Sequence, residues 1–219
     1  VTARIIRNRD VIGDNDINMY INGGIDDLYD PKLLKDSDKL IDILTEKIKQ
    51  KKKIRIIGDY DIDGVTSTYV LLKGLTRIGG KVDTYILLKA LKRAGADVSC
   101  MIPDRIKDGY GLNVELINKA YDDKIDTIIT CDNGIAAIDE IAHAKDLGMT
   151  MLVTDHHAVP YNEESGERIY IKSRADAIVN PHQADCDYPY KELCGAAVAW
   201  KVVILLYERL GISNEEAFE

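Results

Sequence analysis

The sequence predicts an α/β protein, in which helices flank a parallel β-sheet and a small helical segment precedes it. Short apolar runs that suit buried strands alternate with longer segments of helical periodicity along the 219 residues. Three of these apolar runs end in aspartate or histidine residues. Because parallel strands present their carboxyl ends at one edge of a sheet, these side chains are expected to meet there.

The composition is that of an ordinary globular protein with an acidic balance. The chain is long for one domain and short for two, and it can bury a sizeable core. The net charge is -8 and the isoelectric point is about 5.1. Phosphate affinity normally comes from Lys and Arg, so this balance does not by itself indicate a nucleic-acid binder. A bound metal ion would nevertheless reverse the sign of an acidic site.

The cysteine pattern and the hydropathy indicate a cytoplasmic protein with no membrane partner. None of the cysteines forms a C-x-x-C pair, which argues against a zinc ribbon and for a reducing compartment; they are Cys100, Cys131, Cys186 and Cys194. Cys131 lies in an apolar run and is expected to be a buried thiol. No stretch reaches the roughly 18 apolar residues of a membrane span, and the N-terminus has no signal-peptide pattern.

Residues 1–50 are predicted to form the helical N-terminal segment, and residues 51–219 the α/β domain. Asp14 is expected to cap a helix through Ile21, which Gly23 and Gly24 end. Ser37 is expected to cap the next helix, whose apolar face consists of Leu40, Ile41, Leu44 and Ile48. The lysine run 47–53 is interpreted as a solvated helix end, with a phosphate-binding patch as the alternative.

The most informative stretch is the acidic segment that follows the first apolar run, Ile54 to Ile57. It carries Asp59, Asp61 and Asp63 between two glycines. If the segment stays extended, side chains at alternate positions point the same way, so the three carboxylates converge. Carboxylates this crowded repel one another unless a cation neutralises them. The segment therefore predicts a divalent-metal site for phosphodiester cleavage, with a simple acidic turn between strand and helix as the alternative.

A tandem duplication follows. A helix is predicted from Val65 to Ile78, and residues 68–83 resemble residues 84–99, beginning with Thr-Tyr-Val-Leu-Leu-Lys and Thr-Tyr-Ile-Leu-Leu-Lys. One copy would suffice for a crossover between parallel strands. The extra copy either adds a helix to the surface or displaces the first copy into a loop.

The rest of the chain continues the alternation of strands and helices. Strands are predicted at 98–102, 125–131, 150–154 and 177–179, and helices at 113–121 with Asn113 as the cap, 136–147 and 195–210. Residues 158–176 are polar, so they are predicted to be irregular, with a surface loop at 163–167.

The acidic segment, Asp132 and Asp155-His156-His157 all follow strands, so they are expected at one edge of the sheet. Carboxylates with imidazole suit Mn²⁺, carboxylates with water suit Mg²⁺, and two such ions would support phosphoryl displacement. Asp155 is a candidate to orient a histidine, and Arg105 is a candidate to grip a phosphate. The alternatives are a turn residue at Asp132 and a surface arginine at Arg105.

The motifs resemble the DHH phosphoesterase superfamily, and within it the RecJ-like single-strand-specific 5′-to-3′ DNA exonucleases. The resemblance spans nearly the whole chain, and the residues that carry it, in chain order, are 26–31, 58–64, 103–105, 109–113, 132–134, 155–157, 180–183 and 194–201. It implies metal-dependent hydrolysis of single-stranded DNA in repair and recombination, with two Mn²⁺ or Mg²⁺ ions.

The resemblance also implies roles for individual residues. The metal ligands would be Asp59, Asp61, Asp63, Asp132 and His156, with Asp132 bridging the two ions. His157 would face the scissile phosphate as a catalytic residue together with Asp132 and Asp155. The nucleic-acid backbone would contact Arg105, Gly109, Tyr110, Gly111 and Asn113.

The duplicated copy at 84–99 departs from the family pattern. The family also continues beyond residue 219, with a further aspartate ligand and a DHH-associated domain, so the chain is expected to be an N-terminal fragment. One alternative function is that of a DHH enzyme for short oligoribonucleotides or cyclic dinucleotides. Gly58-Asp59-Tyr60 stands where those relatives carry histidine and proline, which favours the exonuclease. The other alternative is a non-catalytic scaffold.

Overall fold

The structure is a computed structural model that describes residues 2–24, 27–85, 111–164 and 166–213. By its contacts the chain divides into two compact units, Val1–Asp30 and Pro31–Glu219. The first unit contains helices α1 (Thr2–Arg7) and α2 (Asp14–Asn22). Gly23 ends α2 as predicted, but Gly13 precedes the helix and Asp14 is its first residue, so the predicted cap was wrong.

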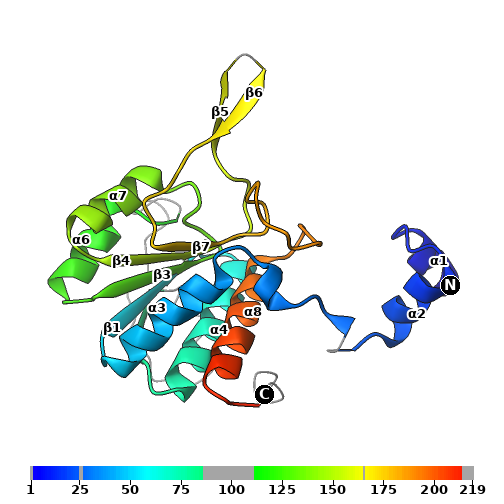
Figure 1. Ribbon diagram of the computed structural model, residues 1–219, viewed down its shortest axis with the longest axis horizontal. Coiled ribbons are helices and arrows are strands. Elements are labelled where there is room, and N and C mark those ends of the chain that lie inside the picture. The colour runs from blue at the N-terminus through cyan, green and yellow to red at the C-terminus, as the bar shows by residue number, and fades with distance from the viewer. Residues whose placement is uncertain (1, 25–26, 86–110, 165, 214–219) are drawn as a thin grey trace. The chain divides into compact units, whose positions relative to one another are not determined.

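The second unit is built on a five-stranded parallel sheet, which confirms the predicted fold class (Figure 1). The strands are β1 (Lys53–Gly58), β2 (Lys81–Tyr85), β3 (Thr127–Cys131), β4 (Thr150–Thr154) and β7 (Ala177–Val179). Their order is β2-β1-β3-β4-β7, and every pairing is parallel. Three neighbouring strands, β1, β3 and β4, therefore deliver the predicted site segments to one edge.

Helices cover both faces of this sheet (Figure 1). Helices α3 (Ser37–Lys49), α4 (Ile62–Arg77) and α8 (Gly195–Arg209) pack on one face, where Ile54, Ile56 and Ile129 are fully buried. Helices α6 (Val114–Asp122) and α7 (Ile138–Asp146) pack on the other face, against Ile57 and Ile128. Alternate side chains of a strand point to opposite faces, so a strand with a helix on each side must be apolar throughout.

Helix α3 buries the predicted apolar face, since Leu40, Ile41 and Leu44 are buried. The predicted cap at Ser37 was wrong, because Asp36 precedes the helix in a left-handed conformation and Ser37 is its first residue. The predicted boundary between the helical segment 1–50 and the α/β domain 51–219 remains a prediction. By its contacts, α3 belongs to the unit that begins at Pro31.

The first copy of the duplicated sequence forms α4 and β2, so it is not displaced into a loop. The bulk of the second copy, from residue 86, and the predicted strand 98–102 lie outside the described residues.

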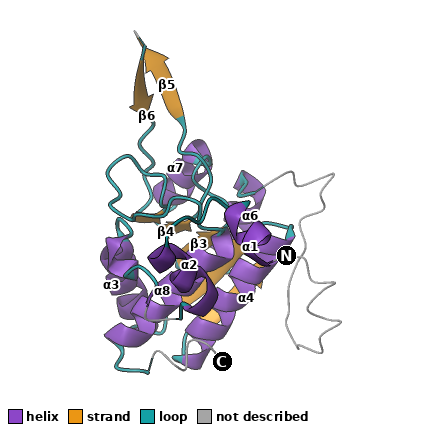
Figure 2. Cartoon of the chain, turned by 90° about the vertical axis from the view of Figure 1, so that its right-hand side faces the viewer, coloured by secondary structure: helices purple, strands orange, loops and turns teal. Residues whose placement is uncertain are grey.

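The segment 158–176 was predicted to be irregular; this is confirmed for 158–160 and 171–175 and wrong for 161–164 and 167–170. Strands β5 (Tyr161–Glu164) and β6 (Glu167–Tyr170) form an antiparallel hairpin that projects from the sheet region (Figure 2). The 3₁₀ turn η2 (Pro31–Leu33) precedes α3. Within the described ranges, no helix combines the length and apolar character needed to cross a bilayer.

Candidate metal centre

The three aspartates of the acidic segment lie between the end of β1 and the first turn of α4. The segment does not stay extended, because α4 begins at Ile62 and Asp61 is its N-cap. The Asp61 carboxylate accepts a hydrogen bond of 2.9 Å from the Gly64 amide. A Cβ atom at Gly64 would lie 2.5 Å from the Asp59 carbonyl oxygen, so this turn requires glycine there. The turn buries Asp59 and exposes Asp61.

Two sets of potential metal ligands meet at the carboxyl ends of β1, β3 and β4. One set is Asp59, Asp61 and Asp132, and the other is Asp132, His156 and His157. Within each set, one ligand atom from every residue lies within 4.8 Å of the others. Asp132 belongs to both sets. Carboxylates with imidazoles are ligands that suit Mn²⁺, so the donor chemistry and the spacing both fit a divalent ion in each set.

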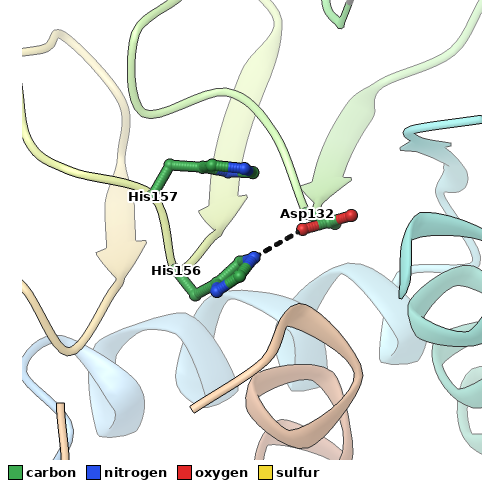
Figure 3. Close-up of side chains that lie close together, drawn as sticks. All are labelled: Asp132, His156 and His157. Atoms are coloured by element: carbon green, nitrogen blue, oxygen red, sulfur yellow. Dashed lines mark ion pairs between the residues drawn. The ribbon is translucent and has the colours of Figure 1, made fainter. Parts of the chain in front are cut away.

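Asp132 is the residue common to both sets, and its carboxylate faces the His156 ring (Figure 3). It follows β3 with φ of 59°, a conformation that is uncommon outside glycine and concentrates at functional sites. Its Oδ1 lies 2.9 Å from His156 Nε2. Burial, together with the negative charges of Asp63 and Asp61, raises the pKa of Asp132 to about 8. A cation bound among these carboxylates would remove that repulsion.

The Asp155 carboxylate holds the two histidines in place through hydrogen bonds. One of its oxygens accepts hydrogen bonds from the His156 amide (2.7 Å), the His157 amide (3.1 Å) and His157 Nδ1 (2.7 Å). The other accepts the Ile135 amide at 2.9 Å. Burial alone would lower the pKa of His157, but the hydrogen bond and charge of Asp155 outweigh it and raise this pKa. Because Nδ1 faces Asp155, the opposite ring nitrogen of His157 is available to a substrate or a metal ion.

Asp63 lies beside these ligands but belongs to neither set within the 4.8 Å limit. Its oxygens accept hydrogen bonds from the first two amides of α8, those of Gly195 at 2.6 Å and Ala196 at 2.7 Å. A carboxylate is favourable at the positive end of a helix. Its Oδ2 is also 3.5 Å from His156 Nε2, so Asp63 both anchors α8 and adds negative charge to the site.

A pocket of about 220 Å³ opens beside the histidines, and its walls include Gly111, Asn133 and His157. Gly111, which the sequence predicts to contact the substrate, therefore lines the same pocket as His157, and its substrate contact remains a prediction. The Asn113 side chain accepts a hydrogen bond of 2.9 Å from the Leu116 amide and caps α6, as the sequence also predicts. The remaining predicted contacts, Arg105, Gly109 and Tyr110, lie outside the described residues.

Sequence reasoning missed two residues that shape this centre. The Asn180 side-chain amide donates to the His157 carbonyl oxygen at 2.9 Å, which holds the loop after β4. At Gly195, a Cβ atom would lie 2.8 Å from Asp132 Oδ1, so only glycine lets α8 approach this carboxylate. Both belong to motifs quoted for the resemblance, but their contacts are with residues far away in the sequence, and no local signal indicates them.

Residues 53–217 match the family model described as DHH family, N-terminal domain. The chain is 39% identical over 184 residues to the single-stranded-DNA-specific exonuclease RecJ of Bacillus subtilis (strain 168). The aligned residues make up 84% of this chain and 20% of that protein. It is 31% identical over 192 residues to the protein of the same name from Haemophilus influenzae, covering 86% of this chain and 29% of that protein.

A solved structure described as exonuclease RecJ bound to manganese is also similar. It aligns with a TM-score of 0.64 at 28% identity, covering 83% of this chain and 40% of that one. The chain therefore spans between a fifth and a third of the length of the two relatives named above.

Proposed function

Because this chain belongs to the DHH family, we propose that it carries the catalytic centre of a metal-dependent 5′-to-3′ exonuclease that hydrolyses phosphodiester bonds of single-stranded DNA. The observation that carries the proposal is the position of Asp132, whose carboxylate is common to both ligand sets. A shared carboxylate is what a pair of neighbouring cations requires. The relatives named as exonucleases of this specificity support the choice of substrate.

The cofactor in this proposal is a pair of Mn²⁺ or Mg²⁺ ions. Asp59, Asp61 and Asp132 would hold one ion, and Asp132 with His156 would hold the other, with His157 within reach. Asp63 remains a predicted ligand. When bound, such ions supply an activated water and neutralise charge that develops on the phosphoryl oxygens. The manganese named in the similar RecJ structure supports this cofactor.

The remaining steps belong to the chain's own side chains. Asp155 fixes the His157 ring through Nδ1, which leaves the other ring nitrogen available to a substrate in the pocket that His157 lines. At that position the protonated ring can donate a hydrogen bond to a phosphoryl oxygen of the substrate. Asp155 would thus act in catalysis as a positioning residue.

The proposal includes the predicted backbone contacts from Arg105 and from the turn Gly109, Tyr110, Gly111 and Asn113. It also includes residues 51–219 as the DHH domain, and a cytoplasmic location with roles in repair and recombination. The relatives' names favour single-stranded DNA over short RNA or cyclic dinucleotides, and the intact ligand sets argue against a non-catalytic scaffold.

The test is release of mononucleotides from the 5′ end of labelled single-stranded DNA in the presence of Mn²⁺. Short RNA and a cyclic dinucleotide serve as competing substrates. Asp132→Ala should abolish release, and excess chelator should do the same. Asp126→Ala is the matched control, since Asp126 precedes β3 while Asp132 follows it. Full activity in Asp132→Ala, or in chelator, would refute the proposed mechanism.

A further inference from the structure

The hairpin β5–β6 is tied to the metal centre by a short connection. His157 and Tyr161 are four residues apart, which limits their Cα atoms to a separation of about 14 Å. The Ile171 amide donates to the Pro160 carbonyl oxygen at 2.9 Å, which continues the pairing of the two strands to the base of the hairpin. The base therefore leads directly into the loop that carries His156 and His157.

One face of this hairpin carries aromatic rings and a guanidinium group. Tyr161 is paired across the strands with Tyr170, and their ring centroids are 6.0 Å apart in an edge arrangement. The Arg168 guanidinium lies 4.6 Å from the centroid of the Tyr161 ring. Both tyrosines remain exposed, at 41% and 39%. Exposed rings beside a cation are the components with which proteins stack the bases of single strands.

A pocket of about 400 Å³ lies at the foot of this face, lined by Tyr170, Lys172 and Ile135 among others. Ile135 also lines the 220 Å³ pocket that contains His157, so the two pockets share this residue as a wall. Lys172 is exposed and forms no ion pair with any residue in the described ranges. The two pockets and the tyrosine pair thus follow one another from His157 to the base of the hairpin.

The charges along the hairpin favour a nucleic acid at its base only. The tip carries Glu163, Glu164 and Glu167, and Glu163 is paired with Arg168 across the strands. Phosphates would be repelled at the tip and attracted toward Lys172 below the tyrosine pair and toward the Arg168 guanidinium, which reaches back from the level of Glu163 over the Tyr161 ring. This distribution suits a single strand that crosses the base of the hairpin and does not run along it.

We propose that the tyrosine pair at the base of this hairpin, with Arg168 and Lys172, is a base-stacking site for single-stranded DNA that extends from the metal centre. The site would stack bases on Tyr161 and Tyr170, and the cations would contact the phosphates. This inference rests on the proposed function for the identity of the strand, and it concerns binding and not hydrolysis. Every base has an aromatic face, so the site would be tolerant of sequence.

The experiment measures the dissociation constant of a fluorescent single-stranded oligonucleotide for the 219-residue chain by anisotropy, in chelator so that hydrolysis is absent. Tyr161→Ala/Tyr170→Ala should weaken binding by roughly five- to a hundredfold. Tyr161→Phe/Tyr170→Phe should retain most of the affinity, which separates stacking from folding. The matched control is Asn162→Ala/Ile169→Ala, a cross-strand pair on the opposite face of the hairpin.

An abasic site moved one nucleotide at a time along the oligonucleotide locates the stacked base. At that position the abasic site should weaken binding to the wild-type chain. The Tyr161→Ala/Tyr170→Ala chain should bind the abasic and the intact oligonucleotide equally well, since it can no longer stack that base. The inference is overturned if the alanine variant binds single strands as tightly as the wild type. It is equally overturned if the wild type binds no single strand, or if the loss is as large for blunt duplex DNA.

These results are separable from those of the proposed function. A chain that binds through the tyrosine pair but hydrolyses nothing with Mn²⁺ refutes the exonuclease and leaves the stacking site in place. A chain that hydrolyses single strands, yet binds them equally well without the tyrosines, refutes the stacking site alone.

Discussion

Replacing Asp132 with asparagine should stabilise the metal-free protein and remove most of the stabilisation that Mn²⁺ gives. The Asp132 carboxylate is buried among other acidic groups, and its pKa is raised to about 8 from the ordinary 3.8. Asparagine has a similar shape and carries no charge, so it relieves the repulsion. The same substitution removes the carboxylate that both ligand sets share.

The size of the effect follows from the pKa. Each pKa unit corresponds to about 1.36 kcal/mol, so keeping Asp132 in this site at pH 7 costs on the order of 4 kcal/mol relative to the unfolded chain. Asparagine loses part of the 2.9 Å interaction with His156, which offsets some of this gain. The expected net stabilisation is about 1–3 kcal/mol. For a chain of this length, each kcal/mol raises the melting temperature by about 2–4 °C.

The assay is thermal unfolding followed by circular dichroism, first in chelator and then in a titration with Mn²⁺. The wild type should gain about 2.7 kcal/mol when Mn²⁺ reaches roughly a hundred times its dissociation constant, and Asp132→Asn should gain much less. The pH dependence has a definite sign. Between 3.8 and about 8 the folded state binds the extra proton, so the stability of the metal-free wild type should fall as pH rises through this window. Asp132→Asn should lack this component.

Asp126→Asn is the matched control for this experiment. Burial would raise the pKa of Asp126, but its hydrogen bond and ion pair with Lys47 outweigh burial and lower this pKa. The same chemical change should therefore destabilise the protein, and it should leave the Mn²⁺ response intact. The reasoning is refuted if Asp132→Asn is no more stable than the wild type in chelator, or if both gain equally from Mn²⁺.

Two further predictions concern the surroundings of Asp132. Gly195→Ala should weaken Mn²⁺ binding by about 10- to 100-fold, because its methyl group would lie 2.8 Å from Asp132 Oδ1. Gly24→Ala, where a Cβ atom meets nothing within 4 Å, should bind as the wild type does, and isothermal calorimetry of both compares them. In the native protein, a thiol reagent should label the exposed Cys194 and leave Cys131 unlabelled until unfolding, since burial raises the pKa of Cys131 to about 12. Mass spectrometry identifies the labelled peptides, and a labelled Cys131 peptide from the native protein would contradict this prediction.

Strands β1, β3, β4 and β7 could be predicted from the sequence because they are largely buried, whereas β2 was not among the predicted strands. Such strands are short apolar runs without alternation, bounded by polar turns, and the runs 150–154 and 177–179 coincide with β4 and β7 to the residue. The parallel arrangement then brings Asp132 and Asp155-His156-His157 to one edge, as predicted, without any knowledge of side-chain contacts.

The hairpin could not be predicted by the same reasoning. None of the residues in β5 and β6 is buried, so no face of either strand had to be apolar. Its pairing rests on cross-strand contacts such as Tyr161 with Tyr170, which involve residues on both sides of the turn. The caps at Asp14 and Ser37 failed because the preceding residues, Gly13 and Asp36, occupy the cap positions without any side-chain hydrogen bond, so the backbone and not a capping side chain sets each helix start.

The acidic segment shows most clearly what sequence reasoning can and cannot resolve. The extended conformation would have given Asp59, Asp61 and Asp63 one common role, but the helix that begins at Ile62 divides them. Asp59 and Asp61 share a ligand set with Asp132, whereas Asp63 accepts two amides of α8 from residues more than 130 positions later. Because α8 enters at Gly195, which touches Asp132, Asp63 also helps to fix the shared carboxylate. The three aspartates of this motif thus make different contacts: Asp59 and Asp61 lie in a potential ligand set, and Asp63 anchors α8, a division that only the packing of α8 determines.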